Sequence, residues 1–130
     1  MGEELKTKIE AKKGVVSAAP ISDGILAGNL LFTSGQVCLK DGKMIDGSIE
    51  EQISQVMKNL KCILEAGGSG FSDVVKTTIY VTDLSIAPKI NEIYRTYLSE
   101  PFPAREMVCV KELPLGAKLE ISMIAIKSKK

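Results

Sequence analysis

The fold is decided near the C-terminus, where the chain reads Pro101-Phe-Pro-Ala-Arg105-Glu-Met-Val-Cys-Val-Lys-Glu-Leu-Pro-Leu-Gly-Ala-Lys-Leu-Glu120-Ile-Ser-Met-Ile-Ala-Ile126. Two apolar runs flank a short turn that contains proline and glycine, so both runs are predicted to be strands. Arg105 opens the first run and Glu120 lies inside the second. A charge in a buried strand is costly unless it is paired or faces a cleft. We therefore expect adjacent strands that hold an arginine and a carboxylate in one small anion-binding pocket.

Upstream, the sequence predicts several short strands. Residues 25–33 read as two strands around Gly28-Asn29, which is a typical two-residue hairpin turn. Residues 6–10 are a further extended candidate, and residues 37–39 continue the second strand of the hairpin until the Asp41-Gly42 turn. The N-terminal third of the chain is therefore expected to supply one side of a sheet.

Two helices and one more strand are expected in the middle of the chain. Ser48 and Glu51 form a capping box, which predicts that a helix starts there, and Gly67-Gly68 predicts where it stops. Its apolar residues recur at helical spacing: Ile49, Ile53, Val56, Met57, Leu60, Ile63 and Leu64. Residues 74–82 alternate in polarity and are rich in β-branched residues, so they are predicted to form a strand. Ser85 is predicted to cap a second helix with Pro88 in its first turn.

This order of elements predicts an α+β fold with two layers, in which two helices cover one face of a mixed sheet. Along the last strand Leu119, Ile121, Met123 and Ala125 point one way, and Ile124 and Ile126 point the other way. Both faces of the sheet therefore carry apolar residues. Since two helices cover only one face, we expect an oligomer in which sheets of different chains pack together.

The composition is that of one soluble globular domain over residues 1–130, with 45% apolar and 25% charged residues. A net charge of +1 offers no strong field for nucleic acid or for an anionic membrane. No apolar run approaches the ~20 residues of a membrane span. Three cysteines without C-x-x-C spacing, and an N-terminus without the pattern of a signal peptide, favour the cytoplasm.

The absence of histidine narrows the chemistry further. It excludes Ser-His and Cys-His nucleophilic systems and histidine-ligated metal sites. It also removes the usual general base for metal-free RNA cleavage. We expect no metal site, and any reaction must use carboxylate, guanidinium, amine, hydroxyl, thiol, backbone or water.

Several segments together resemble the reactive intermediate deaminase family, also called the Rid or YjgF/YER057c/UK114 family. The resemblance runs from about residue 17 to residue 127, in order and with few gaps. The segments that carry it are Asn29-Leu-Leu-Phe-Thr-Ser-Gly-Gln36, Asn59-Leu-Lys-Cys-Ile-Leu-Glu-Ala-Gly67, Asp73-Val-Val-Lys-Thr-Thr-Ile-Tyr-Val-Thr-Asp83, Asn91-Glu-Ile-Tyr94, Pro103-Ala-Arg105 and Leu119-Glu-Ile121.

The resemblance implies a chorismate-mutase-like fold, a homotrimer with clefts between subunits, and hydrolysis of 2-imino acids to 2-keto acids and ammonia. The substrates it implies are tautomers of 2-aminoacrylate and 2-aminocrotonate, and it implies no cofactor. Arg105 matches the carboxylate-binding arginine and Glu120 the residue that positions the attacking water. Ser34 and Gly35 match the Thr-Ser-Gly-Gln loop of the cleft, and Asn91 the asparagine that borders it.

Two positions depart from the family pattern. The loop over the cleft commonly carries tyrosine in a Pro-Tyr-Ser sequence, where this chain has Ile21 between Pro20 and Ser22. The position two residues after the arginine is often cysteine, and here it is Met107, whose backbone carbonyl can still face an imine. We expect the missing phenol to affect rate or substrate range but not the arginine anchor.

Two other functions are compatible with parts of the pattern. A regulatory protein could use the same cleft to bind a small carboxylate metabolite without turnover, and Ile21 is the residue that favours this alternative. Ribonuclease activity is a label that some family members carry. The lack of histidine, the near-zero net charge and the 5% aromatic content argue against it.

Overall fold

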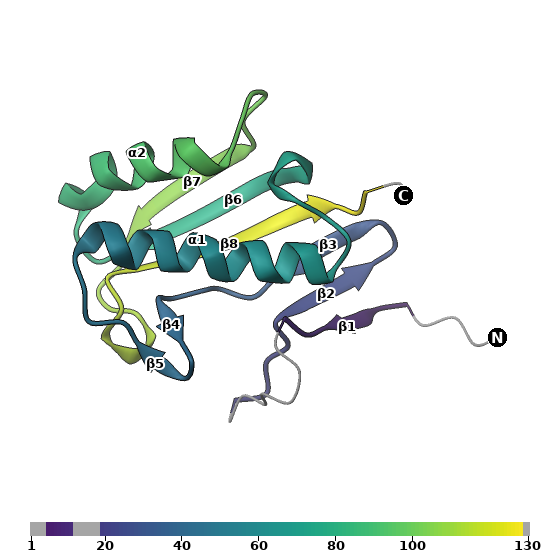
Figure 1. Cartoon of the computed structure of the whole chain (residues 1–130), viewed down its shortest axis with the longest axis horizontal. Helices are drawn as coiled ribbons and strands as arrows, with labels where there is room; N and C mark the ends of the chain where they lie inside the picture. Colours follow the sequence, from purple (N-terminus) through teal and green to yellow (C-terminus); the bar gives the residue numbers. More distant parts are fainter. Residues whose placement is uncertain (1–4, 12–18, 129–130) are drawn as a thin grey trace.

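The protein folds into two layers, as expected for an α+β domain. The computed structural model describes residues 5–11 and 19–128. In it, α1 (Ile49–Ala66) and α2 (Ala87–Tyr97) both lie across one face of a six-stranded sheet (Figure 1). The mixed sheet with helices on one face is thereby confirmed.

The sheet has the strand order β1-β2-β3-β8-β6-β7. Its strands are β1 (Thr7–Ile9), β2 (Gly24–Ala27), β3 (Leu30–Thr33), β6 (Val74–Val81), β7 (Ala104–Cys109) and β8 (Leu119–Ile126). The pair β6–β7 is parallel, and the other pairs in this sheet are antiparallel. The predicted hairpin is confirmed, with Gly28 at φ 62° in its turn.

The prediction that the two C-terminal strands are adjacent is wrong, because β6 lies between β7 and β8. The physical reason is burial. Alternate residues of β6 and β8 are buried along strands of eight residues, whereas no residue of β7 is fully buried. The two strands with a core face pair along their whole length, and the exposed strand β7 is left at the edge.

The helix α1 follows its sequence signals closely. The Ser48 backbone N–H donates to Glu51 Oε1 at 2.8 Å, and the Glu51 N–H donates to Ser48 Oγ at 3.1 Å, so the capping box is formed. The helix ends before Gly67, and Gly68 has a φ of 82°, a backbone conformation that glycine adopts without strain. The buried side of the helix is Ile53, Val56, Met57, Leu60, Ile63 and Leu64.

A small second sheet, β4 (Leu39–Lys40) with β5 (Lys43–Met44), was not expected from the sequence. Its turn is Asp41-Gly42, where φ is 53° and 83°. Two successive residues with positive φ are what a tight hairpin of this type requires, and Asp-Gly is a favoured pair for it. The dipeptide that appeared to end a strand therefore reverses the chain.

The start of α2 differs from the prediction that Ser85 caps it. Asp83 Oδ1 instead accepts a hydrogen bond from the Ser85 N–H at 2.9 Å and caps a single short 3-10 turn. The helix itself begins at Ala87 after Ile86, which makes no side-chain cap, and Pro88 occupies its first turn as predicted. The expected hydroxyl cap of α2 is therefore absent, and the side-chain cap in this segment belongs to the 3-10 turn before it.

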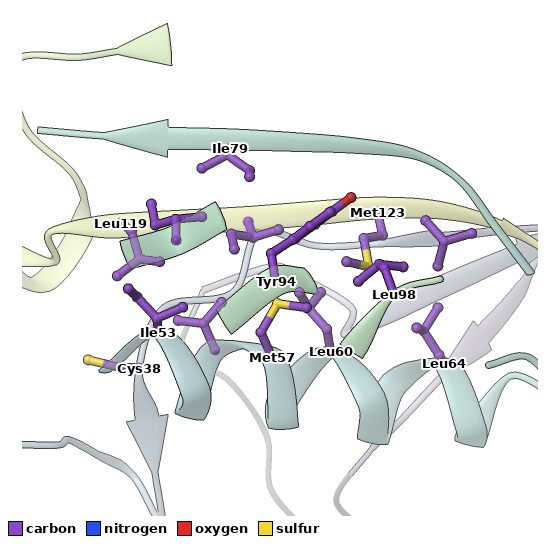
Figure 2. Packing of buried hydrophobic residues seen from close by; sticks show 14 of the residues in the cluster. Cys38, Ile53, Met57, Leu60, Leu64, Ile79, Tyr94, Leu98, Leu119 and Met123 are labelled. Atoms are coloured by element: carbon purple, nitrogen blue, oxygen red, sulfur yellow. The ribbon is translucent and has the colours of Figure 1, made fainter. Parts of the chain in front are cut away.

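The core lies between the helices and the sheet. Figure 2 shows Met57 and Leu60 of α1 pointing toward Met123 of β8, with the ring of Tyr94 between the layers. The Tyr94 hydroxyl bonds to Thr77 Oγ1 at 3.0 Å, so both buried polar groups are satisfied. Of the three cysteines, Cys38 is buried in this core, whereas Cys62 and Cys109 are exposed.

Among the residues that the structure describes, no element forms a layer over the opposite face of the sheet, as the sequence predicted. On this face of the single chain, large apolar side chains are exposed: Leu30, Phe32, Val75, Tyr80, Val108 and Ile126. A sheet face with several exposed large apolar side chains usually marks a contact with another protein. Among the described residues no helix is long and apolar enough to cross a bilayer.

Candidate active site

Arg105 faces the helix layer from the exposed edge strand β7. It lies beside Thr77 in the parallel β6–β7 register, and alternate residues share one face of a strand. Its guanidinium carbon is 5.1 Å from the centroid of the Tyr94 ring, which is a cation–π contact. Burial raises the pKa of Tyr94, so its phenol stays neutral and the ring serves as a fixed platform for the arginine.

A pocket of about 290 Å³ opens in front of Arg105. Its lining residues come from α2, from the segment that leads into β7 and from β7 itself: Asn91, Tyr94, Arg95, Phe102, Pro103 and Arg105. The structure thus brings together two of the predicted site residues, Asn91 and Arg105. Met107 points toward the same layer but packs against the core, and it does not line this pocket.

The Asn91 side chain has an unused acceptor. Its Oδ1 atom is buried and makes no hydrogen bond with the residues that the structure describes. A buried acceptor without a donor costs free energy, so such an atom in a native protein usually receives a hydrogen bond from another molecule. A ligand with an N–H group in this pocket would supply that donor, while the guanidinium of Arg105 would hold an anionic group.

A second set of predicted residues lies at the ends of β2 and β3. Ile21, Ser34 and Gly35 line another pocket, of about 320 Å³. The Ser34 hydroxyl accepts a hydrogen bond from Gln36 Nε2 at 3.0 Å. The Gln36 backbone in turn exchanges two hydrogen bonds with Ile121 of β8, at 2.8 and 3.1 Å. The loop is therefore fixed against the strand that carries Glu120.

Glu120 lies beside this loop, on the uncovered face of the sheet. It is opposite Tyr80 in the β6–β8 register, and a Cβ at Gly35 would overlap its carboxylate. Any larger residue at position 35 would therefore require the Glu120 side chain to move from this position. Burial raises the pKa of the Glu120 carboxyl above its ordinary value of 4.5. A carboxylate with a raised pKa accepts protons more readily near neutral pH.

Within one chain the predicted site residues form two groups rather than one. Arg105 and Asn91 are on the helix side at the β7 edge, and Glu120 is on the bare face, with β6 between them. The expectation of a single arginine–carboxylate pocket made by adjacent strands is therefore wrong for the isolated chain. No three Cys, Asp or Glu side chains of the described residues come together as a metal site requires.

Two residues of the arginine pocket were missed in the sequence. Tyr94 was not singled out as a site residue, yet its ring supports Arg105. Arg95 was not singled out, although it lies four residues after Asn91, a spacing that puts both on the same side of a helix. That spacing is the one signal that could have revealed a second cation in the pocket.

Comparisons with known proteins agree with this architecture. Residues 12–127 match the family model described as endoribonuclease L-PSP. Reactive Intermediate Deaminase A, chloroplastic, of Arabidopsis thaliana is 43% identical over 92% of this chain, and the chain spans 65% of the length of that protein. Human 2-iminobutanoate/2-iminopropanoate deaminase is 33% identical over 98% of this chain and 94% of its own length. The crystal structure of yeast Mmf1 superposes with a TM-score of 0.89 at 32% identity, covering 95% of this chain and 99% of that one.

Proposed function

Because this chain belongs to the endoribonuclease L-PSP family, which includes the reactive intermediate deaminases, we propose that it is a cofactor-free 2-imino acid deaminase. Its substrates are reactive imines of the 2-iminobutanoate and 2-iminopropanoate type, which are the substrates named for the human and mouse relatives. The products are the corresponding 2-keto acids and ammonia.

The observation that carries this proposal is the shared pocket of Arg105 and Asn91. The guanidinium of Arg105 holds the substrate carboxylate by a two-pronged hydrogen bond. The unpartnered Oδ1 of Asn91 accepts a hydrogen bond from the imine N–H. Both contacts leave the electrophilic carbon fixed in place, and fixing a reactant supplies a large part of a rate enhancement.

The reaction needs only water and a group that manages its proton. The oxygen of a water molecule bonds to C2 while the carbon–nitrogen double bond becomes single, and Glu120 passes one proton of this water to the nitrogen, which gives a carbinolamine. Glu120 then takes the remaining hydroxyl proton and passes it to the nitrogen. The carbon–nitrogen bond breaks, the carbon–oxygen double bond forms, and the nitrogen leaves as ammonia. Its partly buried environment and raised pKa support this role. An iminium carbon is already electrophilic, so the lack of histidine is no obstacle.

The complete site lies between two chains of a homotrimer in this proposal. Arg105 and Glu120 are on opposite faces of the sheet within a chain, so one pocket can contain both only if Glu120 comes from a neighbouring chain. The exposed apolar side chains of the bare face, Leu30 and Phe32 among them, support such an assembly.

Sedimentation is therefore expected to give about three times the 14.0 kDa mass of one chain at micromolar concentration. Burial of the bare apolar face is the driving force. As a control, Lys61→Ala, which changes an exposed residue of α1, leaves the sedimentation profile unchanged. A stable species of one chain's mass would contradict the shared site.

The proposed activity predicts that this protein accelerates keto-acid release when 2-iminobutanoate is generated by threonine dehydratase. The imine also decays in water by itself, so the comparison is with the dehydratase alone and with heat-inactivated protein. The rate of imine loss is measured by trapping the remaining imine with semicarbazide. Unaltered imine decay, together with saturable binding of butanoate, would favour the alternative of a carboxylate-binding regulatory protein.

Ile21 distinguishes this site from one with a lid tyrosine. Its side chain is 59% exposed at the rim of the pocket that Ser34 and Gly35 line. Isoleucine excludes water but donates no hydrogen bond, so the site favours imines with an apolar side chain over the smallest one. An added methylene contributes about 1 kcal/mol in such a pocket, which is a several-fold preference.

We also place the protein in the cytoplasm. The three cysteines are unpaired, and two of them, Cys62 and Cys109, are exposed. Exposed free thiols are typical of proteins that work in a reducing compartment.

A further inference from the structure

Arg95 is a second guanidinium in the arginine pocket. It lies on α2, one turn after Asn91, and lines the same space of about 290 Å³ as Arg105. Its guanidinium carbon is 6.0 Å from the centroid of the Phe102 ring, which holds it on the side of the pocket next to the entry of β7. One small pocket is therefore bordered by two arginines.

Neither guanidinium is neutralised by the described part of the chain. The ion pairs there involve Lys8, Lys76 and Lys89 but no arginine. The neighbouring acid on α2, Glu92, acts on Lys89. Two unpaired positive charges that border one pocket repel each other, and a ligand with two anionic groups would neutralise both.

Building on the proposed deaminase function, we propose that the substrates include 2-imino acids whose side chain carries a second carboxylate. Arg105 holds the carboxylate next to the imine carbon, and Arg95 holds the carboxylate of the side chain. Asn91 Oδ1 accepts the imine N–H as before. The smallest suitable member is 2-iminosuccinate, which forms when aspartate is oxidised. Water converts it to the 2-keto dicarboxylic acid and ammonia.

The size of the pocket is compatible with such a ligand. A volume of about 290 Å³ is close to the lower end of the ~300–1,000 Å³ range of small-molecule sites, so a four-carbon dianion is accommodated. The planar guanidinium is also the side chain best suited to carboxylates, because its fork matches the two oxygens. Arg95→Lys is therefore expected to be a partial replacement only.

The test compares two imines with one variant. 2-Iminosuccinate is generated from aspartate by a flavin oxidase, and 2-iminobutanoate from threonine by a dehydratase. In Arg95→Ala the ratio of kcat/KM for 2-iminosuccinate to kcat/KM for 2-iminobutanoate is expected to fall about tenfold, the size of one charge-assisted hydrogen bond at a partly exposed site. Lys89→Ala removes the same charge from the same helix outside the pocket, and the ratio stays at the wild-type value.

Binding of stable analogues gives a readout that does not depend on turnover. Calorimetry with succinate and with butanoate should show that Arg95→Ala weakens succinate binding about tenfold relative to butanoate. Added salt should weaken succinate binding to the wild type more than butanoate binding, because two charge contacts are screened instead of one.

The outcomes separate the two proposals. If the wild type hydrolyses 2-iminobutanoate but leaves 2-iminosuccinate at its spontaneous rate, the dicarboxylate inference is overturned and the deaminase function stands. An unchanged ratio in Arg95→Ala overturns it equally. If neither imine is hydrolysed but succinate binding still depends on Arg95, the deaminase function fails while the dianion site remains.

Discussion

Replacement of Arg105 by alanine is expected to lower kcat/KM for 2-iminobutanoate by at least about 100-fold, because the two charged hydrogen bonds that hold the substrate carboxylate are lost together. The substrate then lies in the pocket without a fixed orientation, so kcat falls as well as the affinity. The initial rate of keto-acid formation across a range of imine concentrations measures both effects.

The fold itself should survive this change. Arg105 is exposed on the edge strand β7, and within the described part of the chain its loss removes the contact with Tyr94, worth about 0.5–1 kcal/mol at an exposed site. Arg105→Lys keeps the charge but not the fork, so an intermediate rate is expected. Lys61→Ala on α1 serves as the control for loss of one positive charge. Full activity in Arg105→Ala with a native melting curve would remove Arg105 from the site.

The change Glu120→Gln is expected to lower kcat by about 100-fold while KM changes little, because an amide cannot take the proton of the attacking water. The substitution keeps the size of the side chain beside Gly35, so the packing of the loop is preserved. Steady-state kinetics at pH 7 separate the two parameters. A kcat equal to that of the wild type would exclude Glu120 from proton transfer.

The pH profile gives an independent check on Glu120. Burial raises the pKa of this carboxyl above 4.5, and the proton-accepting form is the ionised one. As pH falls through the raised pKa, the carboxyl becomes protonated and kcat decreases, at a higher pH than an ordinary glutamate would give. In Glu120→Gln this acid limb should disappear from the residual activity. An acid limb that persists would belong to another group.

Local sequence signals predicted most of the elements but not all of their neighbours. Ser48 with Glu51 and the following apolar spacing determined α1, and Gly28-Asn29 determined the first hairpin, because these signals act within a few residues. The pairing of β8 with β6 depends on which strands bury the most surface together. That is a property of the whole fold, and no short stretch of sequence contains it.

The candidate site shows the same difference between what local sequence predicts and what depends on the whole fold. The residue types were informative, since Arg105 and Asn91 line one pocket and Gly35 contacts Glu120. The sequence placed Arg105 and Glu120 together because they stand near each other along the chain and at strand positions. Their faces depend on the register with β6, where Thr77 is beside Arg105 and Tyr80 is beside Glu120. An odd separation along β6 puts them on opposite faces, and the sequence alone did not reveal that register.

The position of β8 in the sheet has a consequence for how the protein forms during translation. This strand is the last of the sheet to be synthesised, yet it lies at the centre, between β3 and β6. Until it leaves the ribosome, β1–β3 and β6–β7 are two fragments that share no backbone hydrogen bonds within the sheet. The nascent chain therefore exposes both unpaired edges and its apolar surface, the condition in which chains aggregate or bind chaperones. The sheet can therefore be completed only late, in one step, after Leu119–Ile126 has been synthesised.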